Sequence, residues 1–350
     1  MQEGDIGSPV VTRRIAVLTA GVVFLVLFGL LGTTLPVPYV AQVPGPTFNT
    51  LGDIDGSPII TVHGRATNKV SGHLNLTTVG VSRGGLSLVQ AVRGWFDDEI
   101  AVVPEEAVYP PGHSEKETRD ANRQAFLTSE QAAESAALGH LGYPVKVVVQ
   151  EVPKGSPSAS VLAVGDTMDA VDGRATPDAE TLTKVLTGIP AGTAVTVDTT
   201  HLGTPRRVTI TTKAAQGRKG SMLGVSVLAQ PSAPFDVQID VKDVGGPSAG
   251  LMLTLGILDL VGKDDLTKGK VVAGTGTIDA QGHVGPIGGI TLKMAAAKGI
   301  GAQLFLVPAD NCAEATGVAD PGFPLAKVAS LDDGLKALSD FEAGRTPARC

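Results

Sequence analysis

The chain has 350 residues, of which 43% are hydrophobic and only 18% are charged, so it can bury the cores of two or three domains. Its formal net charge is −7 and it has no long basic run. This argues against nucleic acid as a partner, because phosphate binding needs a basic face.

The first predicted element is an uncharged apolar run, "IAVLTAGVVFLVLFGLLGTTL", at residues 15–35. A helix of this length reaches about 30 Å, the thickness of the hydrocarbon core of a bilayer. Arg13 and Arg14 precede the run, and the next basic residue is Arg65. The positive-inside rule therefore predicts a cytoplasmic tail at residues 1–14, an anchor in the cytoplasmic membrane, and the rest of the chain outside. A cleaved signal peptide is the alternative, but the run is longer than the usual apolar region and no A-x-A site follows it.

Residues 36–124 are expected to form an extracytoplasmic segment that contains β-structure. Four prolines within 36–52 favour an extended exit from the membrane. The β-branched alternation of "GHLNLTTVGV" (72–81) predicts a strand, and "LSLVQAVRGWF" (86–96) has helical spacing. Residues 97–120 mix acidic residues with Pro and Gly, which predicts irregular surface.

Residues 125–213 combine short strands with tight turns and two helices. The predicted elements are a helix over 128–142 capped by Thr128 or Ser129 and ended by Gly142, a strand over 143–152, a strand and Asp-Gly turn over 164–174, a helix over 178–187 and a hairpin around Leu202-Gly203.

This pattern, with "GSPSAS" followed by "VGDTMDAVDG", resembles a PDZ domain of the bacterial, protease-associated kind. The resemblance implies that the domain binds peptide C-termini by adding a strand to a sheet edge. It also implies that a loop holds the peptide carboxylate with backbone N–H groups, and the matching positions are Leu141, Gly142, Tyr143 and Val145. Pro144 departs from the pattern because it lacks an N–H. A PDZ-like spacer without a ligand is the alternative.

"DVGGPSAGLMLTLGILD" (243–259) places a lone serine, Ser248, just before an apolar helix. The fixed φ of Pro247 suits a first helical turn, and Gly246 can take backbone angles that other residues resist. The hydroxyl would lie at a helix N-terminus, where free N–H groups stabilise an oxyanion. The alternative is a glycine-rich turn with a capping serine.

Lys293 lies in a second stretch, "GTGTIDAQGHVGPIGGITLKMAAAKGIGA" (274–302), early in a predicted helix and among apolar residues. An apolar environment lowers the pKa of a lysine because it disfavours the charged amine. A general base near neutral pH needs a pKa about 2–3 units below the usual value. The alternative is a solvated helix lysine.

"GGPSAG" and "PIGGITLK" together resemble the proteolytic domain of Lon proteases, over about residues 220–340. The resemblance implies that Ser248 is the nucleophile, that Lys293 is the general base and that Thr275 supports the lysine. Lon proteins usually carry an acid close before "GPSAG". Here Asp243 lies five residues before Ser248, so its role stays open.

The sequence contains no P-loop, no HExxH and no GxSxG motif, so no nucleotide, metal or other cofactor is expected. Cys312 and Cys350 follow the predicted anchor, on the exported side, where a disulfide is permitted. The sequence leaves their pairing open.

We therefore expect an α+β protein with an N-terminal transmembrane helix, a PDZ-like β-rich domain and a Lon-protease-like α/β proteolytic domain. "VPGPTFNTLG" and "SGHLNLTTV" add to a resemblance to the membrane-anchored PDZ–Lon (YlbL-like) family of bacteria. The resemblance implies an ATP-independent serine endopeptidase that cleaves unfolded or exported proteins and forms a homo-oligomer, with residues 36–96 packed on the Lon-type domain. The alternative is a non-catalytic PDZ adaptor or scaffold for exported proteins.

Overall fold

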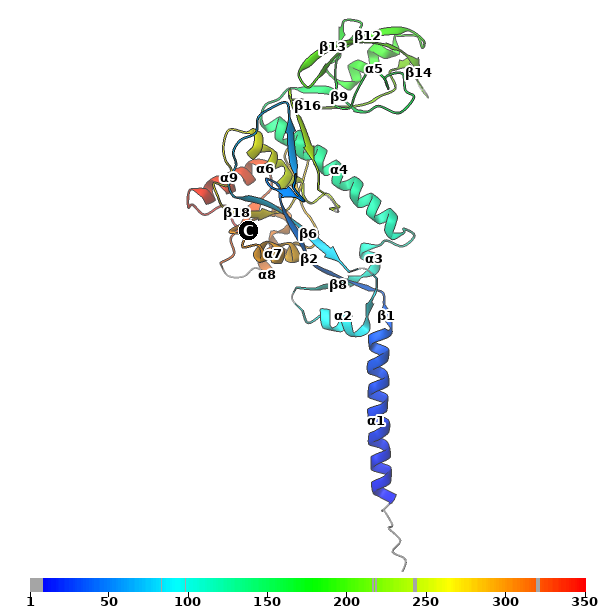
Figure 1. Cartoon of the computed structure of the whole chain (residues 1–350), viewed down its shortest axis with the longest axis vertical. Helices are drawn as coiled ribbons and strands as arrows, with labels where there is room; N and C mark the ends of the chain where they lie inside the picture. The colour runs from blue at the N-terminus through cyan, green and yellow to red at the C-terminus, as the bar shows by residue number, and fades with distance from the viewer. Residues whose placement is uncertain are drawn as a thin grey trace, which may run out of the picture. The chain divides into compact units, whose positions relative to one another are not determined.

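The computed structural model describes residues 9–82, 84–97, 99–215, 217, 219–241, 244–318 and 322–350, with side chains from Arg13 onward (Figure 1). The chain divides into two compact units. The first comprises Met1–Pro46 and Val79–Thr118, and the second comprises Thr47–Thr78 and Arg119–Cys350. Strand β2 (Tyr39–Asn49), strand β6 (His73–Val81) and helix α4 (Glu115–His140) each continue from one unit into the other.

Helix α1 (Pro9–Thr34) begins the first unit and is the long blue helix of Figure 1. It is long and apolar enough to cross a membrane, and only 6% of its most apolar window is buried. A core helix of a soluble domain would be mostly buried, because its apolar side chains need protein neighbours. The sequence prediction of an apolar helix over residues 15–35 is therefore confirmed, with the helix ending one residue earlier.

The rest of the first unit is a small set of short elements. β1 (Pro36–Val37) pairs with β7 (Leu86–Ser87), and β2 pairs with β8 (Ala101–Pro104), both antiparallel. Helix α2 (Leu88–Gly94) follows β7 and starts with a capping box between Ser87 and Gln90. A short helix, α3 (Glu105–Val108), follows β8. The prediction of irregular surface over 97–120 is therefore wrong, since this stretch holds β8, α3 and the first turns of α4.

Helix α4 starts at Glu115, thirteen residues before the predicted position. Ser114 Oγ accepts a hydrogen bond from the backbone N–H of Glu117, and the Glu117 carboxylate accepts one from the N–H of Ser114. This capping box satisfies two N–H groups of the first turn. Thr128 lies inside the helix and donates to the carbonyl of Gln124, so it is not the cap. The predicted end is correct, because Gly142 adopts φ +79° just after the helix.

The second unit has a parallel sheet at its centre. β6 pairs in parallel with β18 (Val271–Gly274), β18 with β21 (Leu304–Pro308), and β21 with β22 (Leu325–Val328). The helices of this part are α6 (Gly250–Val261), α7 (Ile290–Gly299), the 3-10 helix η1 (Ala309–Asn311), α8 (Cys312–Val318) and α9 (Leu331–Glu342). All twelve residues of α6 are buried, which explains why its sequence is apolar on every side.

Small antiparallel pairs complete this part of the unit. They are β3 (Asp53–Ile54) with β4 (Ser57–Pro58), β5 (Ile60–His63) with β17 (Asp236–Ile239), and β19 (Thr277–Ile278) with β20 (Val284–Gly285). A disulfide joins Cys312 to Cys350, which resolves the pairing that the sequence left open.

A β-rich module within the second unit, drawn in green in Figure 1, has its own core. Its sheet has the order β13-β12-β10-β9-β16, with β11 paired to β10. The elements are β9 (Val145–Glu151), β10 (Thr167–Val171), β11 (Arg174–Ala175), α5 (Ala179–Thr187), β12 (Ala194–His201), β13 (Thr204–Thr211), β14 (Lys213–Ala214), β15 (Ser221–Met222) and β16 (Ser226–Pro231). The sheet thus extends past residue 213, because β16 returns to pair with β9.

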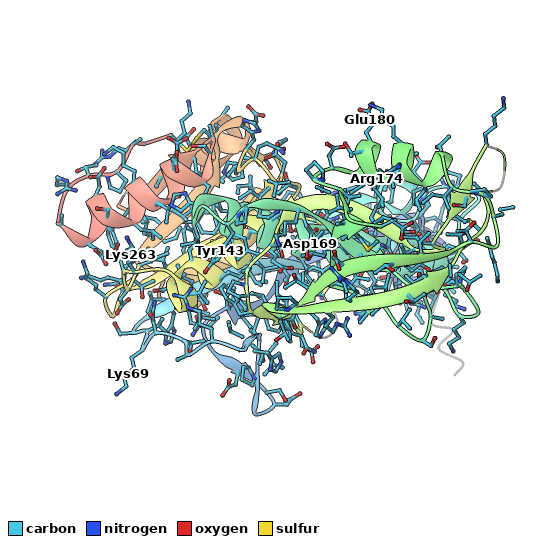
Figure 2. The ribbon with its side chains drawn as sticks, turned by 90° about the horizontal axis from the view of Figure 1, so that it is seen from above. Lys69, Tyr143, Asp169, Arg174, Glu180 and Lys263 are labelled. Atoms are coloured by element: carbon cyan, nitrogen blue, oxygen red, sulfur yellow. A yellow bond between two sulfur atoms is a disulfide. The ribbon has the colours of Figure 1, made fainter. Side chains whose placement is uncertain are left out.

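Turn chemistry and polar side chains fix the register of this module. Leu202 and Gly203 have φ of +47° and +78°, which is the two-residue hairpin turn whose twist matches the strands. Asp169 of β10 accepts hydrogen bonds from Lys146 of β9 and Thr200 of β12. Figure 2 shows Asp169 together with Glu180 of α5 among the side chains of the module. The expected fold class, α+β with an N-terminal apolar helix, a β-rich domain and an α/β domain, is confirmed.

Candidate active site

Ser248 lies in the turn immediately before helix α6. Gly246 has φ +84°, a conformation that a side chain would disfavour. Gly250, the first residue of α6, has no room for a side chain either. An added Cβ would lie 2.9 Å from both Ile278 Cγ2 and Ser129 Oγ. The "GGPSAG" sequence therefore reflects both a backbone angle and a close approach of neighbouring elements.

Helix α4 holds this turn at two points. The N–H of Gly246 donates to the carbonyl of Asn122 at 2.8 Å, and Ser129 Oγ donates to the carbonyl of Pro247 at 3.0 Å. The two contacts fix the backbone of the turn that leads into Ser248. The sequence suggested Ser129 only as a helix cap, and this positioning contact was missed.

Lys293 meets Ser248 from helix α7. Its side chain is 3% exposed, and its Nζ is hydrogen bonded to Ser248 Oγ at 2.6 Å. Burial lowers the pKa of Lys293 to about 8, because the charged amine loses its hydration. A neutral amine with a free lone pair is thus available near neutral pH, beside a serine hydroxyl.

Thr275, which follows strand β18, completes the cluster and is fully buried. Its hydroxyl donates to the carbonyl of Ser248 at 3.0 Å and lies 3.0 Å from Lys293 Nζ. A hydroxyl has one proton to donate. Since that proton goes to the carbonyl, Thr275 must accept from an N–H of Lys293, which leaves the lone pair of the neutral amine for Ser248.

Asn311 of η1 fixes the turn that precedes helix α7. Its side chain is 6% exposed and forms two hydrogen bonds of 2.9 Å with the backbone N–H and carbonyl of Ile287. The turn continues to Gly289, which has a φ of +69° and immediately precedes α7. Asn311 therefore sets the origin of the helix that carries Lys293. No spacing in the sequence linked Asn311 to residue 287.

Two further predictions concern residues around the site. Asp243 lies outside the described residues, so its role stays open. Among the residues that the structure describes, no group of three or more His, Cys, Asp or Glu side chains is placed to hold a metal ion.

The loop predicted to hold a peptide carboxylate has no backbone N–H to offer at its first three positions. Leu141, Gly142 and Tyr143 donate to the carbonyls of Ala137, Gly139 and Leu138, which closes the end of helix α4. The prediction from "LGYPV" is therefore wrong for these residues. Helix ends need such N–H groups to satisfy their last carbonyls, and no residue pattern indicated that these groups were already used.

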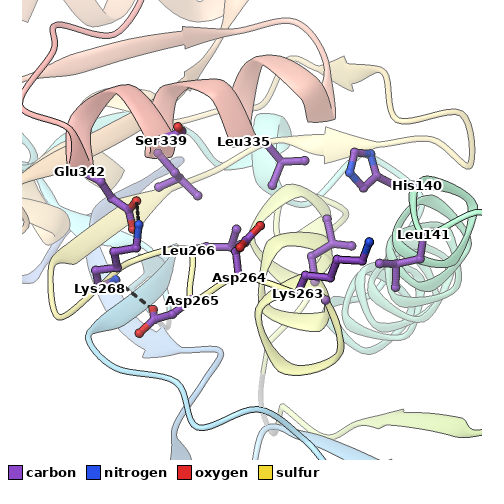
Figure 3. A pocket seen from close by; sticks show the side chains of 13 residues that line it. His140, Leu141, Lys263, Asp264, Asp265, Leu266, Lys268, Leu335, Ser339 and Glu342 are labelled. Atoms are coloured by element: carbon purple, nitrogen blue, oxygen red, sulfur yellow. Dashed lines mark hydrogen bonds and ion pairs between the residues drawn. The ribbon is translucent and has the colours of Figure 1, made fainter.

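Three of the predicted loop residues also face different surroundings. Leu141 lines a cavity of about 650 Å³ together with Lys263 and Leu335, as Figure 3 shows. Tyr143 lines another cavity, of about 520 Å³. Val145 starts strand β9, where it pairs with Pro231. Leu141 and Tyr143 thus line different cavities.

The part of the chain that holds Ser248 and Lys293 has known relatives. Residues 239–323 match the family of Lon protease (S16) C-terminal proteolytic domains. The chain is also similar to Lon protease 2 of Bacillus subtilis (strain 168), with 33% identity over 101 residues. This similarity covers 28% of the chain and 18% of the length of that protein.

The chain also has structural neighbours among bacterial PDZ domains. One is the PDZ domain of an SdrC-like protein from Listeria monocytogenes, with 22% identity and a TM-score of 0.23, covering 24% of this chain and 87% of that one. Another is the PDZ domain of an SdrC-like protein from Listeria innocua, with 20% identity and a TM-score of 0.22, covering 23% and 92%. The match to the Lon proteolytic family and the N-terminal apolar helix agree with what the sequence predicted for these two parts of the chain.

Proposed function

We propose that the protein is a serine endopeptidase in which Ser248 is the nucleophile and Lys293 the general base. The observation that carries the proposal is the 2.6 Å contact between Ser248 Oγ and the buried amine of Lys293. A nucleophile within hydrogen-bond reach of a base, with the base oriented by a third group, is the arrangement that activates a hydroxyl. Thr275 is that third group.

In the first step, Ser248 Oγ attacks the carbonyl carbon of the scissile peptide while its proton passes to Lys293 Nζ. Backbone N–H groups at the start of α6 stabilise the oxyanion that forms, because the first N–H groups of a helix have no acceptor within it. The Lys293 ammonium then gives the proton to the leaving amine. Water, deprotonated by the same lysine, releases the acyl group and restores Ser248.

The substrates proposed are unfolded or loosely folded exported proteins. The sequence contains no nucleotide-binding P-loop, and a protease without an unfoldase acts on chains that are already accessible. Arg13 and Arg14 before the apolar helix α1 support an orientation with the N-terminus in the cytoplasm and the catalytic unit outside. Assembly into a homo-oligomer stays a prediction.

We place peptide recognition by the module at strand β16 rather than at residues 141–145. In the described part of the chain β16 pairs only with β9, so it is an edge strand. Helix α5 contacts β16, and the exposed Leu228 lies on it. An open strand edge offers a row of unpaired backbone groups to an extended peptide.

The experiment uses the full-length chain in lipid nanodiscs, with β-casein as a loosely folded substrate and a fluorophosphonate probe of active serines. Wild type should cleave casein and take up the probe at Ser248. Ser248→Ala and Lys293→Met should each reduce cleavage at least about 1000-fold, with unchanged circular dichroism. Lys298→Met, on the same helix, is the matched control and should stay active. Full turnover by folded Ser248→Ala would refute the proposal, and peptide binding without turnover by wild type would favour the adaptor.

A further inference from the structure

The first unit exposes a cluster of large apolar side chains on and just after helix α2. Leu88, Val92, Trp95 and Phe96 are 37%, 39%, 57% and 87% exposed. Their spacing of four, three and one residues puts them on one side of a helical turn. We call these four residues the α2 patch. Exposed clusters of large apolar residues on a folded protein mark interaction surfaces.

The α2 patch is fixed next to the point where helix α1 ends. The N–H of Leu88 donates to the carbonyl of Leu35 at 3.3 Å. Strand β7, which leads into α2, pairs with β1, which follows α1. A Cβ added to Gly32 of α1 would lie 3.3 Å from Val89 Cγ2. Helix α2 therefore packs directly on the last turn of the apolar span.

The composition of the patch suits the interface of a bilayer. Trp combines a large apolar ring with a polar N–H, and it is enriched at the level of the lipid headgroups. Trp95 also packs edge-on against Tyr39, with ring centroids 6.0 Å apart, so both interfacial ring types lie in one place. Arg93 of the same helix is exposed and can reach phosphate groups while its stem lies along apolar surface.

We propose that the α2 patch inserts into the headgroup region of the bilayer that α1 spans, and that it holds the first unit against the membrane surface. The inference rests on the proposed membrane span of α1. Continuity favours lipid over another partner: the patch begins where the apolar span stops, so a bilayer around α1 meets Leu88 and Trp95 without any further component.

Trp95 is the only tryptophan of the chain, so its fluorescence reports on the patch alone. The full-length protein is reconstituted in vesicles of phosphatidylcholine, either plain or brominated near the headgroup end of the acyl chains. Bromine near the headgroups should reduce Trp95 emission to about half or less, because the ring lies at that depth. Aqueous iodide should quench it weakly.

A triple variant, Leu88→Ser with Val92→Ser and Phe96→Ser, should lose most of the bromine quenching and gain iodide quenching. Val318→Ser removes an exposed apolar side chain (52% exposed) in the second unit, and it should leave both signals unchanged. Equal emission in plain and brominated vesicles would overturn the proposal. So would shielding of Trp95 from iodide without bromine quenching, which would mean that a second copy or another protein covers the patch.

Flotation and alkaline extraction of the same vesicles separate this inference from the anchor on which it rests. If α1 spans the bilayer, wild type and the triple variant both resist extraction whatever the patch does. Resistance without bromine quenching would overturn the inference alone, while extraction of the wild type would overturn both. Cleavage of casein depends on Ser248 and Lys293 in the second unit, so it tests the proposed function independently of the α2 patch.

Discussion

The hydroxyl of Thr275 lies 3.0 Å from the amine of Lys293 and donates a hydrogen bond to the carbonyl of Ser248. One buried hydroxyl therefore links the proposed base to the backbone of the proposed nucleophile. This relationship orients the lone pair of Lys293, and it leads to the first prediction.

Thr275→Val keeps the shape of the side chain but removes both hydrogen bonds. We expect kcat to fall about 10–100-fold, because a buried hydrogen bond to a polar partner that then stays unsatisfied costs about 1–3 kcal/mol. KM for a peptide substrate should change little, since Thr275 does not contact the substrate in this mechanism. Thr275→Ser, which retains the hydroxyl, should recover most of the rate. A larger loss in the Ser variant than in the Val variant would show that packing, and not the hydroxyl, matters at this position.

The pH dependence of kcat/KM should follow the amine of Lys293. Burial lowers the pKa of Lys293 to about 8, and only the neutral amine can take the proton of Ser248. The rate should therefore rise about tenfold per pH unit below about 8 and become constant above it. Initial rates of peptide cleavage between pH 4 and 10 measure this profile. A rising limb near pH 4–5, where carboxylates titrate, would contradict the assignment of Lys293 as the base.

Asn311→Ala should lower both stability and activity. The backbone N–H and carbonyl of Ile287 would lose their partners, at about 1–3 kcal/mol, and the turn that starts α7 would loosen. Asn68→Ala is a matched control, because Asn68 also forms two 2.9 Å hydrogen bonds with backbone groups, both donated to the carbonyls of Asp259 and Gly262. Thermal melts should show similar destabilisation in both variants. The value of kcat, measured at a temperature where both variants are folded, should fall in Asn311→Ala only.

Asp259 should make folding stability depend on pH. It is fully buried with one carboxylate oxygen unpaired, and burial raises its pKa to about 7. Between about pH 4 and 7 the folded state holds a proton that the unfolded state has released, so this group lowers stability as pH rises through that window. Asp259→Asn removes the charge and keeps the oxygen that accepts from the N–H of Leu266. Its Tm should exceed that of wild type by a few degrees at pH 8 and by less at pH 5, and a constant difference would exclude the titration.

The disulfide between Cys312 and Cys350 should stabilise the second unit. The two cysteines are 38 residues apart, and closing a loop of this length in the unfolded chain is worth roughly 3–4 kcal/mol. The double variant Cys312→Ser, Cys350→Ser should therefore unfold at a lower denaturant midpoint. Its cleavage rate at low temperature should match that of wild type, because neither cysteine contacts Ser248, Lys293 or Thr275 in the structure. A large loss of activity in the folded double variant would point to a role beyond stability.

The sequence predicted those parts of the molecule that depend on local chemistry. The turn before Ser248, the apolar surroundings of Lys293 and the Leu202-Gly203 hairpin each follow from residue types within a few positions. The contacts of Asn122, Ser129 and Asn311 could not be predicted, because each joins a polar side chain or carbonyl to a backbone group from a distant part of the chain. The start of α4 was missed for a local reason: Pro110, Pro111 and Gly112 indicated a loop, and they hid the capping box that begins two residues later.

The predicted peptide-binding loop shows a different limit of prediction from sequence. Residues 141–145 have the position and composition of a carboxylate-binding loop, but what such a loop does depends on which N–H groups are free. In this chain the end of α4 uses them. The edge strand β16 was not recognised because its pairing with β9 joins segments about 80 residues apart.

The complete burial of helix α6 bears on how the protein would lose activity on heating. The residues after Ser248 have no solvent-facing side, so the nucleophile cannot detach by fraying of a surface segment; opening it means taking the whole α/β core apart. Heat inactivation of this protein should then coincide with calorimetric melting of that core, instead of preceding it as it does in enzymes whose catalytic groups sit on loosely held loops.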